Sequence, residues 1–290
     1  MSGLRETALA DIGKITERHP KLMGPSLIAR LPMFLVVAVA IVTLIFGFAT
    51  LDVSWRRVFN GFGELGKIAS LMLPPDYGTP ARLMTWTQSL LETLAIAFLG
   101  TLLAAIVAFP LGFLVARNVV PSWIFRFSLR RGLDGLRGID TLIWALIWIN
   151  VVGLGPFAGV LAIMTSDIGG FGKLFSEAIE AADDKPGEGV ISTGGSDFHR
   201  IVFGLIPQVM PVLLSQVLYY FESNTRSATI IGIVGAGGIG LHLSEQIRTL
   251  EWQHVSFIVL MILVTVAIID TVSARIRFAI IGGQDPGAQK

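Results

Sequence analysis

The chain contains no cysteine and few charged residues, which make up only 15% of its 290 positions. The lack of cysteine excludes disulfides, thiol nucleophiles and thiolate metal ligands, and it leaves the compartment undecided. The net charge is +1, so no global field points to nucleic acid or to an acidic partner. What the chain has in abundance is apolar sequence, with 53% hydrophobic residues and a mean hydropathy of +0.71. This composition lies outside the globular range and indicates an integral membrane protein.

Apolar runs long enough to cross a membrane recur along the chain. About 20 apolar residues span the hydrocarbon, and this length predicts a first transmembrane helix at 31–51. Further spans are expected at 90–116, 138–153, 156–176, 198–222 and 255–281. The pattern predicts an all-α membrane protein with about six transmembrane helices and both termini on one side.

Basic residues near the span ends set the expected orientation, because cytoplasmic flanks carry an excess of Lys and Arg. The connection at 117–137 holds five arginines against the single acid Asp134, and Arg275 and Arg277 close the last span. Both termini are therefore expected in the cytoplasm, together with Lys14, Arg18, Lys21 and Arg30. The expected parts are a cytoplasmic segment at 1–30, the first span at 31–51, an external segment at 52–83, a core transmembrane domain at 84–282 and a cytoplasmic tail at 283–290.

The external segment at 52–83 runs against this orientation, because it holds Arg56, Arg57, Lys67 and Arg82. Its apolar residues recur at helical spacing and are Trp55, Val58, Phe59, Phe62, Leu65 and Leu71. The spacing predicts a helix lying along the outer membrane interface. A loop packed on its own protein fits the same pattern equally well.

The stretch GIVGAGGIG at 232–240 contains the pattern GxGxxG, in Gly235, Gly237, Gly238 and Gly240. That pattern marks a dinucleotide site only between a strand and a helix of a βαβ unit. Segments that cross lipid cannot form an open sheet, because its edges leave backbone groups unpaired in hydrocarbon. Gly232, Ala236 and Gly240 place small residues at every fourth position. This spacing favours close helix packing, or backbone that lines an enclosed pathway.

The longest polar interruption on the expected cytoplasmic side runs from about 177 to 200. Pro186 and a following glycine pair divide it into a short helix, a tight turn and a helix that enters the membrane. Ser196 and Asp197 are candidate N-caps for the last of these. Such an L-shaped element offers a rigid handle to a cytoplasmic partner.

Within this interruption, Glu188 is followed by Gly194 six residues later and by Pro207 nineteen residues later. The spacing resembles the EAA motif of bacterial ABC importer permeases, although Gly189 and Val190 stand where that motif has alanines. Three further stretches are VGLGPFAGVLA at 152–162, GKLFSEAIE at 172–180 and SNTRSATIIGIVGAGGIG at 223–240. Together they are similar to the permease subunit of the phosphonate and phosphite branch of these importers. The similarity runs from about Trp86 to Gly282.

This resemblance implies a type I ABC importer permease of MetI-like architecture in the bacterial inner membrane. It implies two permease copies, expected to be identical, around a central path, and an external binding protein that delivers a phosphonate-like oxyanion. Two cytoplasmic subunits would bind ATP and Mg²⁺ and drive alternating access. The implied contact with these ATPase subunits is the coupling loop, with Glu188, Gly194, Gly195, His199 and Pro207.

The chain shows no ATP site of its own in sequence. Its nearest approach to GxxxxGK[ST] is GGFGKL, where Leu174 fills the hydroxyl position and Asp167 that of the first glycine. No directly bound cofactor is expected. Metal binding is not expected either, because His19, His199, His242 and His254 show no ligand spacing.

Several polar residues are candidates for the translocation path. Arg226, with Ser227 beside it, is the foremost, because a guanidinium and exposed N–H groups match phosphonate oxygens; snorkelling to lipid headgroups is the alternative. Glu92 lies in an apolar span, where a pathway role and an interface-level structural role are both open. Asp167 stands, with Ser166, where the family often has a histidine, and lies about 16 Å into its helix. It should face protein, in an internal pair or against the ammonium of an aminophosphonate. The glycines 235, 237, 238 and 240 complete the predicted path.

Other functions stay open from sequence alone. A permease of the same kind could carry methionine or another small anion. An ion-coupled secondary transporter would show interrupted helices in both halves of an inverted repeat, whereas one glycine-rich interruption is visible. A membrane enzyme would need a nucleophile, a base and an orienting group, and no such set stands at a recognisable spacing.

Overall fold

The chain is helical throughout its described part. The computed structural model describes residues 27–51 and 54–282, and no strand occurs among them. The predicted cytoplasmic segment as far as residue 26, which includes Lys14, Arg18, His19 and Lys21, and the predicted tail at 283–290 lie outside the described residues. The chain divides into two units, Met1–Lys67 and Ile68–Lys290, and each is described by itself.

The first unit contains the predicted first span. Helix α3 (Leu27–Thr50) includes residues 31–50, which have a mean hydropathy of 2.7 and no Asp, Glu, Lys or Arg. Helix α4 (Trp55–Leu71) begins in this unit and ends beyond its boundary. The helix predicted within 52–83 is therefore present, and the side of the membrane on which it lies stays a prediction.

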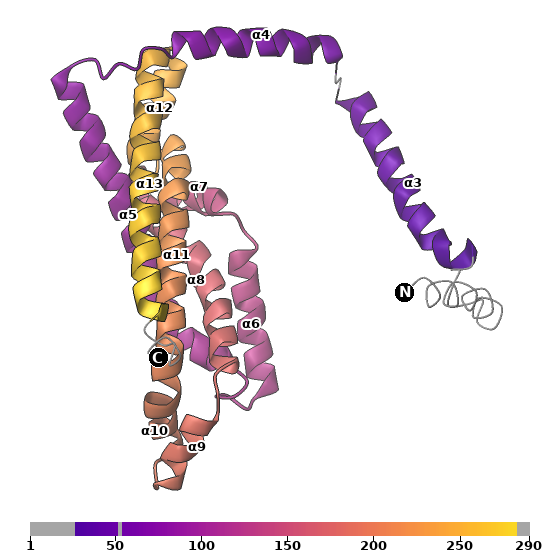
Figure 1. The fold of residues 1–290 in the computed structure, drawn as a ribbon, viewed down its shortest axis with the longest axis vertical. Helices are drawn as coiled ribbons and strands as arrows, with labels where there is room; N and C mark the ends of the chain where they lie inside the picture. The colour runs from indigo at the N-terminus through magenta and orange to yellow at the C-terminus, as the bar shows by residue number, and fades with distance from the viewer. Residues whose placement is uncertain (1–26, 52–53, 283–290) are drawn as a thin grey trace, which may run out of the picture. The chain divides into compact units, whose positions relative to one another are not determined.

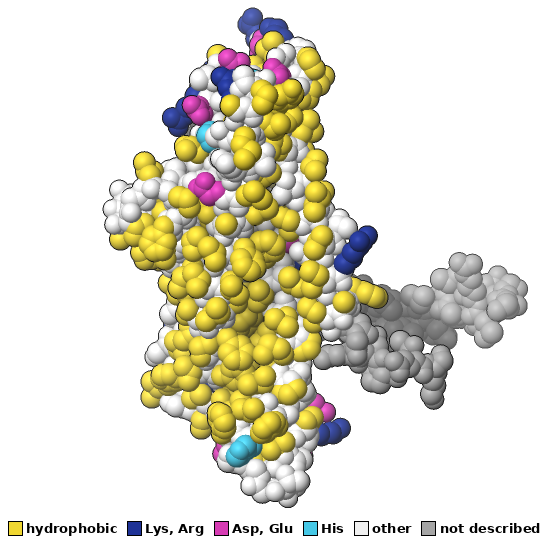
Figure 2. All heavy atoms as spheres, turned by 90° about the vertical axis from the view of Figure 1, so that its left-hand side faces the viewer, with side chains coloured by type: hydrophobic (Ala, Val, Ile, Leu, Met, Phe, Trp, Pro, Cys, Tyr) yellow, Lys and Arg dark blue, Asp and Glu magenta, His cyan; other side chains and the backbone are white. Residues whose placement is uncertain are grey.

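Three stretches of the second unit are long and apolar enough to cross a membrane. They are α5 (Pro80–Val115), residues 197–233 ending in α11 (Ile206–Ile233), and α13 (Trp252–Gly282). With α3 they make four candidate spans in the described residues, or five if a bent helix pair counts as one. The predicted all-α membrane architecture is confirmed, and the expected count of about six spans is approximate. Hydrophobic side chains cover the middle of the face drawn in Figure 2.

The predicted span at 138–153 is wrong in length. Helix α7 (Thr141–Val152) has 12 residues, which reach only about 18 Å, against about 30 Å of hydrocarbon. It is bent by 87° from the preceding helix α6 (Trp123–Arg137). The connection at 117–137 was predicted as a basic segment, without this helix. Asp140 caps α7 by accepting the Leu142 N–H at 2.8 Å, so the break is built into the sequence.

Helix α8 (Pro156–Glu180) forms the centre of the second unit and packs against α5, α6, α7 and α11. Small residues let the neighbours approach closely. A Cβ added at Gly112 of α5 would lie 2.7 Å from the Phe175 Cβ, and one at Gly169 would lie 2.6 Å from the Arg137 backbone nitrogen. Phe171 and Phe175 are fully enclosed there. Asp167 and Ser176 of α8 are therefore surrounded by protein.

The functional candidates lie at the two ends of the second unit and along its middle. Figure 1 shows α9 (Lys185–Ser192) and α10 (Asp197–His199) at one end and α12 (Ile239–Arg248) at the other. Helix α11 runs from the first end to the second, and α13 runs back beside it.

Candidate functional site

The segment between α8 and α11, residues 183–205 and here called the α9 element, has the predicted order of short helix, turn and entering helix. Helix α9 ends at a turn where Gly194 has a φ of +87°, a conformation suited to glycine. The Ser196 hydroxyl then accepts the His199 N–H at 3.4 Å and caps α10. The π-helical turn η1 (Arg200–Leu205) follows and leads into α11, where Pro207 lies in the first turn.

Close contacts hold the two arms of the α9 element together. A Cβ added at Gly204 would lie 2.7 Å from the Gly187 Cα, so the backbones touch there. The Gln208 side chain accepts the Asp183 N–H at 3.2 Å and donates to the Asp183 carbonyl at 3.1 Å. The element is therefore joined to α11 at both arms and can move as one piece.

Glu180, the last residue of α8, ties the root of the α9 element to α5 and α6. Its carboxylate accepts the Arg117 N–H at 2.9 Å and a guanidinium N–H of Arg130 at 3.2 Å. The Arg200 guanidinium donates to the Asn118 carbonyl at 3.3 Å. The sequence did not single out Glu180, because its partners are 50 and 63 positions away. These bonds allow a displacement of α9 to reach the membrane helices.

The tip of the α9 element carries exposed side chains. Glu188 is exposed on the first turn of α9. The exposed apolar residues of the element include Ile191, Phe198 and Phe203, and the His199 ring stacks on Phe203 with centroids 6.0 Å apart. Exposed large apolar residues on one small element are typical of a protein interaction surface.

The glycine-rich stretch forms the turn between α11 and α12. Gly235, Gly237 and Gly238 have φ values from +77° to +102°, which other residues rarely adopt. The Gly155 N–H donates to the Gly235 carbonyl at 3.0 Å, so the start of α8 closes the turn. No strand precedes it in the described residues, and the setting of a dinucleotide site is missing.

Two side chains of α5 hold the start of α12. Glu92 Oε1 accepts the Gly238 N–H at 3.2 Å, and Thr93 Oγ1 accepts the Ile239 N–H at 2.8 Å. These bonds satisfy N–H groups that lack a partner within the helix, and the helix dipole favours a carboxylate at this end. Glu92 thus has a structural role, and a part in the pathway stays a prediction.

Small residues bring α11 and α12 into contact, as expected from the spacing of Gly232, Ala236 and Gly240. A Cβ added at Gly232 would lie 3.1 Å from the Gly240 Cα. All three residues are buried. These contacts support the interpretation that the small residues allow close helix packing. That the glycines also line the pathway stays a prediction.

Asp167 faces protein, as its position predicts. It is buried in α8, and its Oδ2 accepts an N–H of the Asn224 amide of α11 at 2.5 Å. The same amide donates to Thr101 Oγ1 of α5 at 2.8 Å. The internal pairing expected for Asp167 is present, and it joins the three central helices.

We expect Asn224→Ala to destabilise the protein by about 3 kcal/mol, because it leaves a buried carboxylate without its hydrogen-bond donor. Thermal unfolding of the purified protein in detergent measures the loss. Asn150→Ala is the matched control, since the exposed Asn150 amide bonds only the Leu146 carbonyl one turn away. Equal midpoints for the two variants would contradict a structural role for the Asp167 network.

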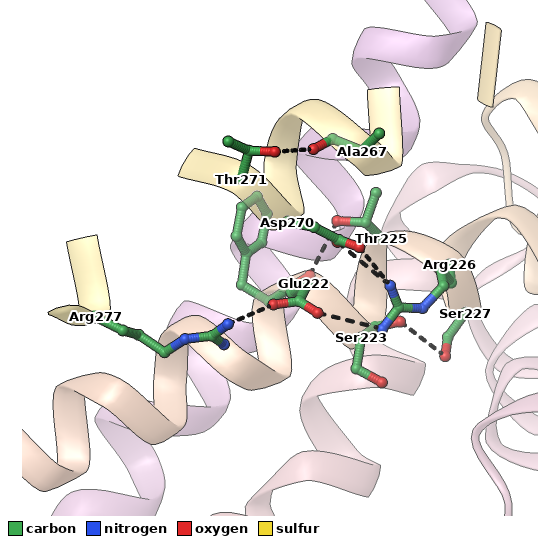
Figure 3. Close-up of polar contacts among 10 residues, drawn as sticks. Glu222, Ser223, Thr225, Arg226, Ser227, Ala267, Asp270, Thr271 and Arg277 are labelled. Atoms are coloured by element: carbon green, nitrogen blue, oxygen red, sulfur yellow. Dashed lines mark hydrogen bonds and ion pairs between the residues drawn. The ribbon is translucent and has the colours of Figure 1, made fainter. Parts of the chain in front are cut away.

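Arg226 lies in a cluster of four charged side chains between α11 and α13 (Figure 3). Its guanidinium lies 3.6 Å from Glu222 Oε1 and 3.4 Å from Asp270 Oδ1. The second guanidinium, of Arg277, donates to Glu222 Oε2 at 3.0 Å. We call these four residues the charge cluster. Arg226 is thus paired with carboxylates, and the adjacent Ser227 hydroxyl donates to the Ser223 carbonyl at 3.4 Å.

The charge cluster belongs to a polar face of α11. Ser215, Tyr219, Glu222 and Arg226 recur at intervals of four, three and four residues, which places them on one side of a helix. A hollow of about 430 Å³ opens on part of this face, lined by Leu174, Pro211, Val212, Ser215, Gln216, Tyr219 and Tyr220. Ser215 Oγ and Gln216 Oε1 are buried without a hydrogen-bond partner in the described residues.

Sequence reasoning found Arg226 but missed Glu222, Asp270 and Arg277. The signal was available, since Glu222 and Asp270 lie within the apolar runs predicted as spans, and an ionisable residue there is a functional candidate by default. The sequence did not show, however, that these side chains lie close to one another. This closeness depends on α13 returning beside α11, which joins positions 44 and 55 residues apart.

The histidines of the described residues show no metal cluster, since no group of three or more His, Asp or Glu there is placed to hold an ion. His242 lies 3.5 Å from Glu245, and His254 lies 3.9 Å from both Asp76 and Glu251.

Comparison with known proteins agrees with this architecture. Residues 108–281 match the family described as "Binding-protein-dependent transport system inner membrane component". The chain is 39% identical over 237 residues to the putative phosphite transport system permease protein HtxC of Stutzerimonas stutzeri, covering 81% of this chain and 83% of that protein. It is 35% identical to the phosphate-import permease protein PhnE of Mycolicibacterium smegmatis, covering 79% of this chain and 44% of that protein.

Among solved structures, an inward-facing MetNI methionine ABC transporter chain superposes with a TM-score of 0.60 at 17% identity. The match covers 70% of this chain and 99% of that one, and it shows a shared fold. The fold and the family match together define a multi-pass permease component of a binding-protein-dependent importer. The chain belongs to the family of binding-protein-dependent transport system inner membrane components.

Proposed function

We propose that the chain is the permease subunit of an ATP-binding cassette importer that carries phosphonate-like oxyanions into a bacterial cell. The names of its relatives support this substrate class, since they transport phosphite and phosphate. The observation that carries the proposal is the charge cluster, which places the guanidinium groups of Arg226 on α11 and Arg277 on α13 within two apolar candidate spans. Guanidinium groups bind phosphorus oxyanions well.

The proposed path follows this face and reaches the turn between α11 and α12. It includes Arg226, Ser227, Gly235, Gly237, Gly238, Gly240 and Glu92. An external binding protein would deliver the anion at the α12 end of the second unit. Transport would require no cofactor bound to this chain.

At the other end, the α9 element is the proposed contact with two cytoplasmic subunits that bind ATP and Mg²⁺. The exposed residues Glu188, Gly194 and His199 at its tip, with the half-buried Gly195 beside Gly194, support this assignment. Its attachment to α11 near Pro207 supports it too. Closure of the ATPase pair would move the element and alternate access, because a conformational change needs contacts that differ between two states. A second permease copy, expected to be identical, would complete the path. Both termini would then be cytoplasmic, and α13 does end toward the α9 element (Figure 1).

Uptake of labelled methylphosphonate and aminoethylphosphonate tests the proposal directly. Cells that lack this chain are compared with cells restored by the wild type, with phosphite, phosphate and methionine as unlabelled competitors. We expect uptake that needs the chain, falls with phosphite and resists methionine. If methionine alone competes, the proposed phosphonate substrate is wrong, whereas the assignment as a permease still holds. No chain-dependent uptake, with the chain inserted and its ATPase present, would discard the phosphonate substrate.

A further inference from the structure

The charge cluster lies within two candidate spans, residues 197–233 and 252–280. Asp270 is 18 residues after Trp252 in the 31-residue helix α13, so it lies about 27 Å along a helix of about 46 Å. Glu222 is 16 residues after Ile206 in the 28-residue helix α11, about 24 Å along a helix of about 42 Å. Both carboxylates therefore lie inside their helices rather than at a helix end, whereas Arg277 lies three residues before the end of its candidate span at Ile280.

The cluster is only partly covered by its own chain. The side chains of Arg226 and Asp270 are 47% and 42% exposed, whereas those of Glu222 and Arg277 are 13% and 25% exposed. A charged group inside a membrane span is disfavoured against lipid and faces either protein or a water-filled cavity. The open side of the cluster therefore points into an aqueous route or onto another subunit.

One hydrogen-bonding atom of the charge cluster has no partner among the described residues. Arg277 Nη1 is buried and has no hydrogen-bond partner in the described residues. The Arg277 guanidinium lies 6.0 Å from the centre of the Tyr219 ring, and Tyr219 also lines the hollow of about 430 Å³. A buried donor without a partner is destabilising unless something else binds it.

We propose that Arg226 and Arg277 form an exchange site at which a phosphorus oxyanion in transit takes the place of the Glu222 and Asp270 carboxylates on the two guanidinium groups. The empty site has two positive and two negative groups, so its charges are balanced without an anion. The arriving anion gains bidentate guanidinium contacts, and the displaced carboxylates compete for its release. A transport site must bind firmly enough to admit its substrate and weakly enough to release it. This inference rests on the proposed function, because it assumes that the carried anion passes this face.

The natural absence of cysteine makes the site accessible to a direct test. A single cysteine is introduced at Ser223, one turn before Arg226, in the full importer reconstituted with its ATPase and binding protein. The matched control is Leu99→Cys, because Leu99 lies mid-way along α5 and is 46% exposed, close to the value for Arg226. An anionic methanethiosulfonate reagent should modify Ser223→Cys more than about tenfold faster than Leu99→Cys, because hydrocarbon excludes the charged reagent. Equal slow rates at both positions would overturn the aqueous route.

Protection by substrate identifies the anion site. Methylphosphonate or phosphite under turnover should slow modification of Ser223→Cys by about threefold or more, as expected for a site at least about two-thirds occupied. The same anion should give no protection when Arg277→Gln is added. Asp270→Asn removes a competing carboxylate, so protection should appear at lower anion concentration. Protection that is absent in Ser223→Cys, or unchanged by Arg277→Gln, would overturn the exchange site.

A merely structural ion pair would behave differently. In the double variant Glu222→Gln and Arg277→Gln, neutral amides can keep a hydrogen bond between α11 and α13, and no unpaired charge remains. The exchange site predicts that uptake falls at least about tenfold with a normal amount of inserted chain, since one of the two charge-assisted donors is gone. Normal uptake by the double variant would overturn it. The exchange site alone fails if the wild type carries phosphonates but the anion does not protect Ser223→Cys and the double variant keeps its uptake. If the wild type carries none of these anions, the proposed function fails, and the exchange site fails with it.

Discussion

Glu188→Lys is expected to abolish ATP-driven uptake while the chain still folds and inserts. Glu188 is exposed, and it lies in the first turn of α9. Reversing its charge against the helix dipole costs only about 0.3–1 kcal/mol locally. A complementary surface on a partner would meet a repulsive charge, and like charges brought together at an interface cost several kcal/mol. At about 1.4 kcal/mol per factor of ten, such a loss would reduce productive docking by a hundredfold or more.

The measurement compares labelled uptake with ATP hydrolysis by the reconstituted importer. In Glu188→Lys, transport should be lost and hydrolysis should no longer respond to the loaded binding protein. Glu64→Lys is the matched control, because Glu64 is an exposed acid on α4 that belongs to the first unit. Unchanged uptake by Glu188→Lys, or an equal loss in Glu64→Lys, would show that the α9 element is not the coupling contact.

The attachment of α9 explains why a surface charge at its tip can matter to the membrane helices. Glu180 bonds Arg117 and Arg130, and Gln208 bonds both backbone polar groups of Asp183. A loosely tethered loop would absorb a displacement at its tip. Here hydrogen bonds and close backbone contacts join the element to α6, α11 and the segment after α5, so we expect a displacement of its tip to be passed to them.

Local features of the α9 element could be predicted from sequence, whereas its attachment could not. The pattern of Pro186, Gly194 and Ser196 gave a helix, a turn and a capped helix because each residue acts on neighbours within one turn. Long apolar runs likewise predicted α5, α11 and α13, since burial in lipid depends on composition along a segment. The predicted span at 138–153 is too long because a rule based on the length of an apolar run does not detect where a helix begins. In the structure a new helix begins after Asp140, at a sharp bend.

Pairings between distant helices were beyond sequence reasoning. Asp167 was expected to face protein because a carboxylate at that depth is disfavoured in lipid, yet nothing local identified Asn224 as its partner, 57 positions away. Glu92 shows the same limit, since its place in an apolar run fitted two roles. The structure shows a contact that fits the structural role, because the Glu92 carboxylate accepts the Gly238 N–H. This bond depends on the turn after α11 lying against α5.

Gly238→Val is expected to prevent stable insertion of the chain. Gly238 has φ +77° and ψ −169°, a combination that residues other than glycine essentially do not adopt. An added Cβ would also collide with Thr93 Oγ1. That oxygen cannot move aside freely, because it accepts the Ile239 N–H and donates to the Ser89 carbonyl at 2.9 Å. The turn must therefore open and release its bonds to α5.

The expected loss combines backbone strain of about 1–3 kcal/mol with about 1 kcal/mol for each hydrogen bond that breaks. Such a total is a large share of the 5–15 kcal/mol that stabilises a typical folded protein. The amount of chain in membranes, and its thermal midpoint after extraction, measure the effect. Gly189→Ala is the control, because Gly189 lies within α9 and no atom lies within 4 Å of an added Cβ. Normal amounts of Gly238→Val would mean that the turn tolerates another backbone conformation and that Glu92 and Thr93 do not hold it.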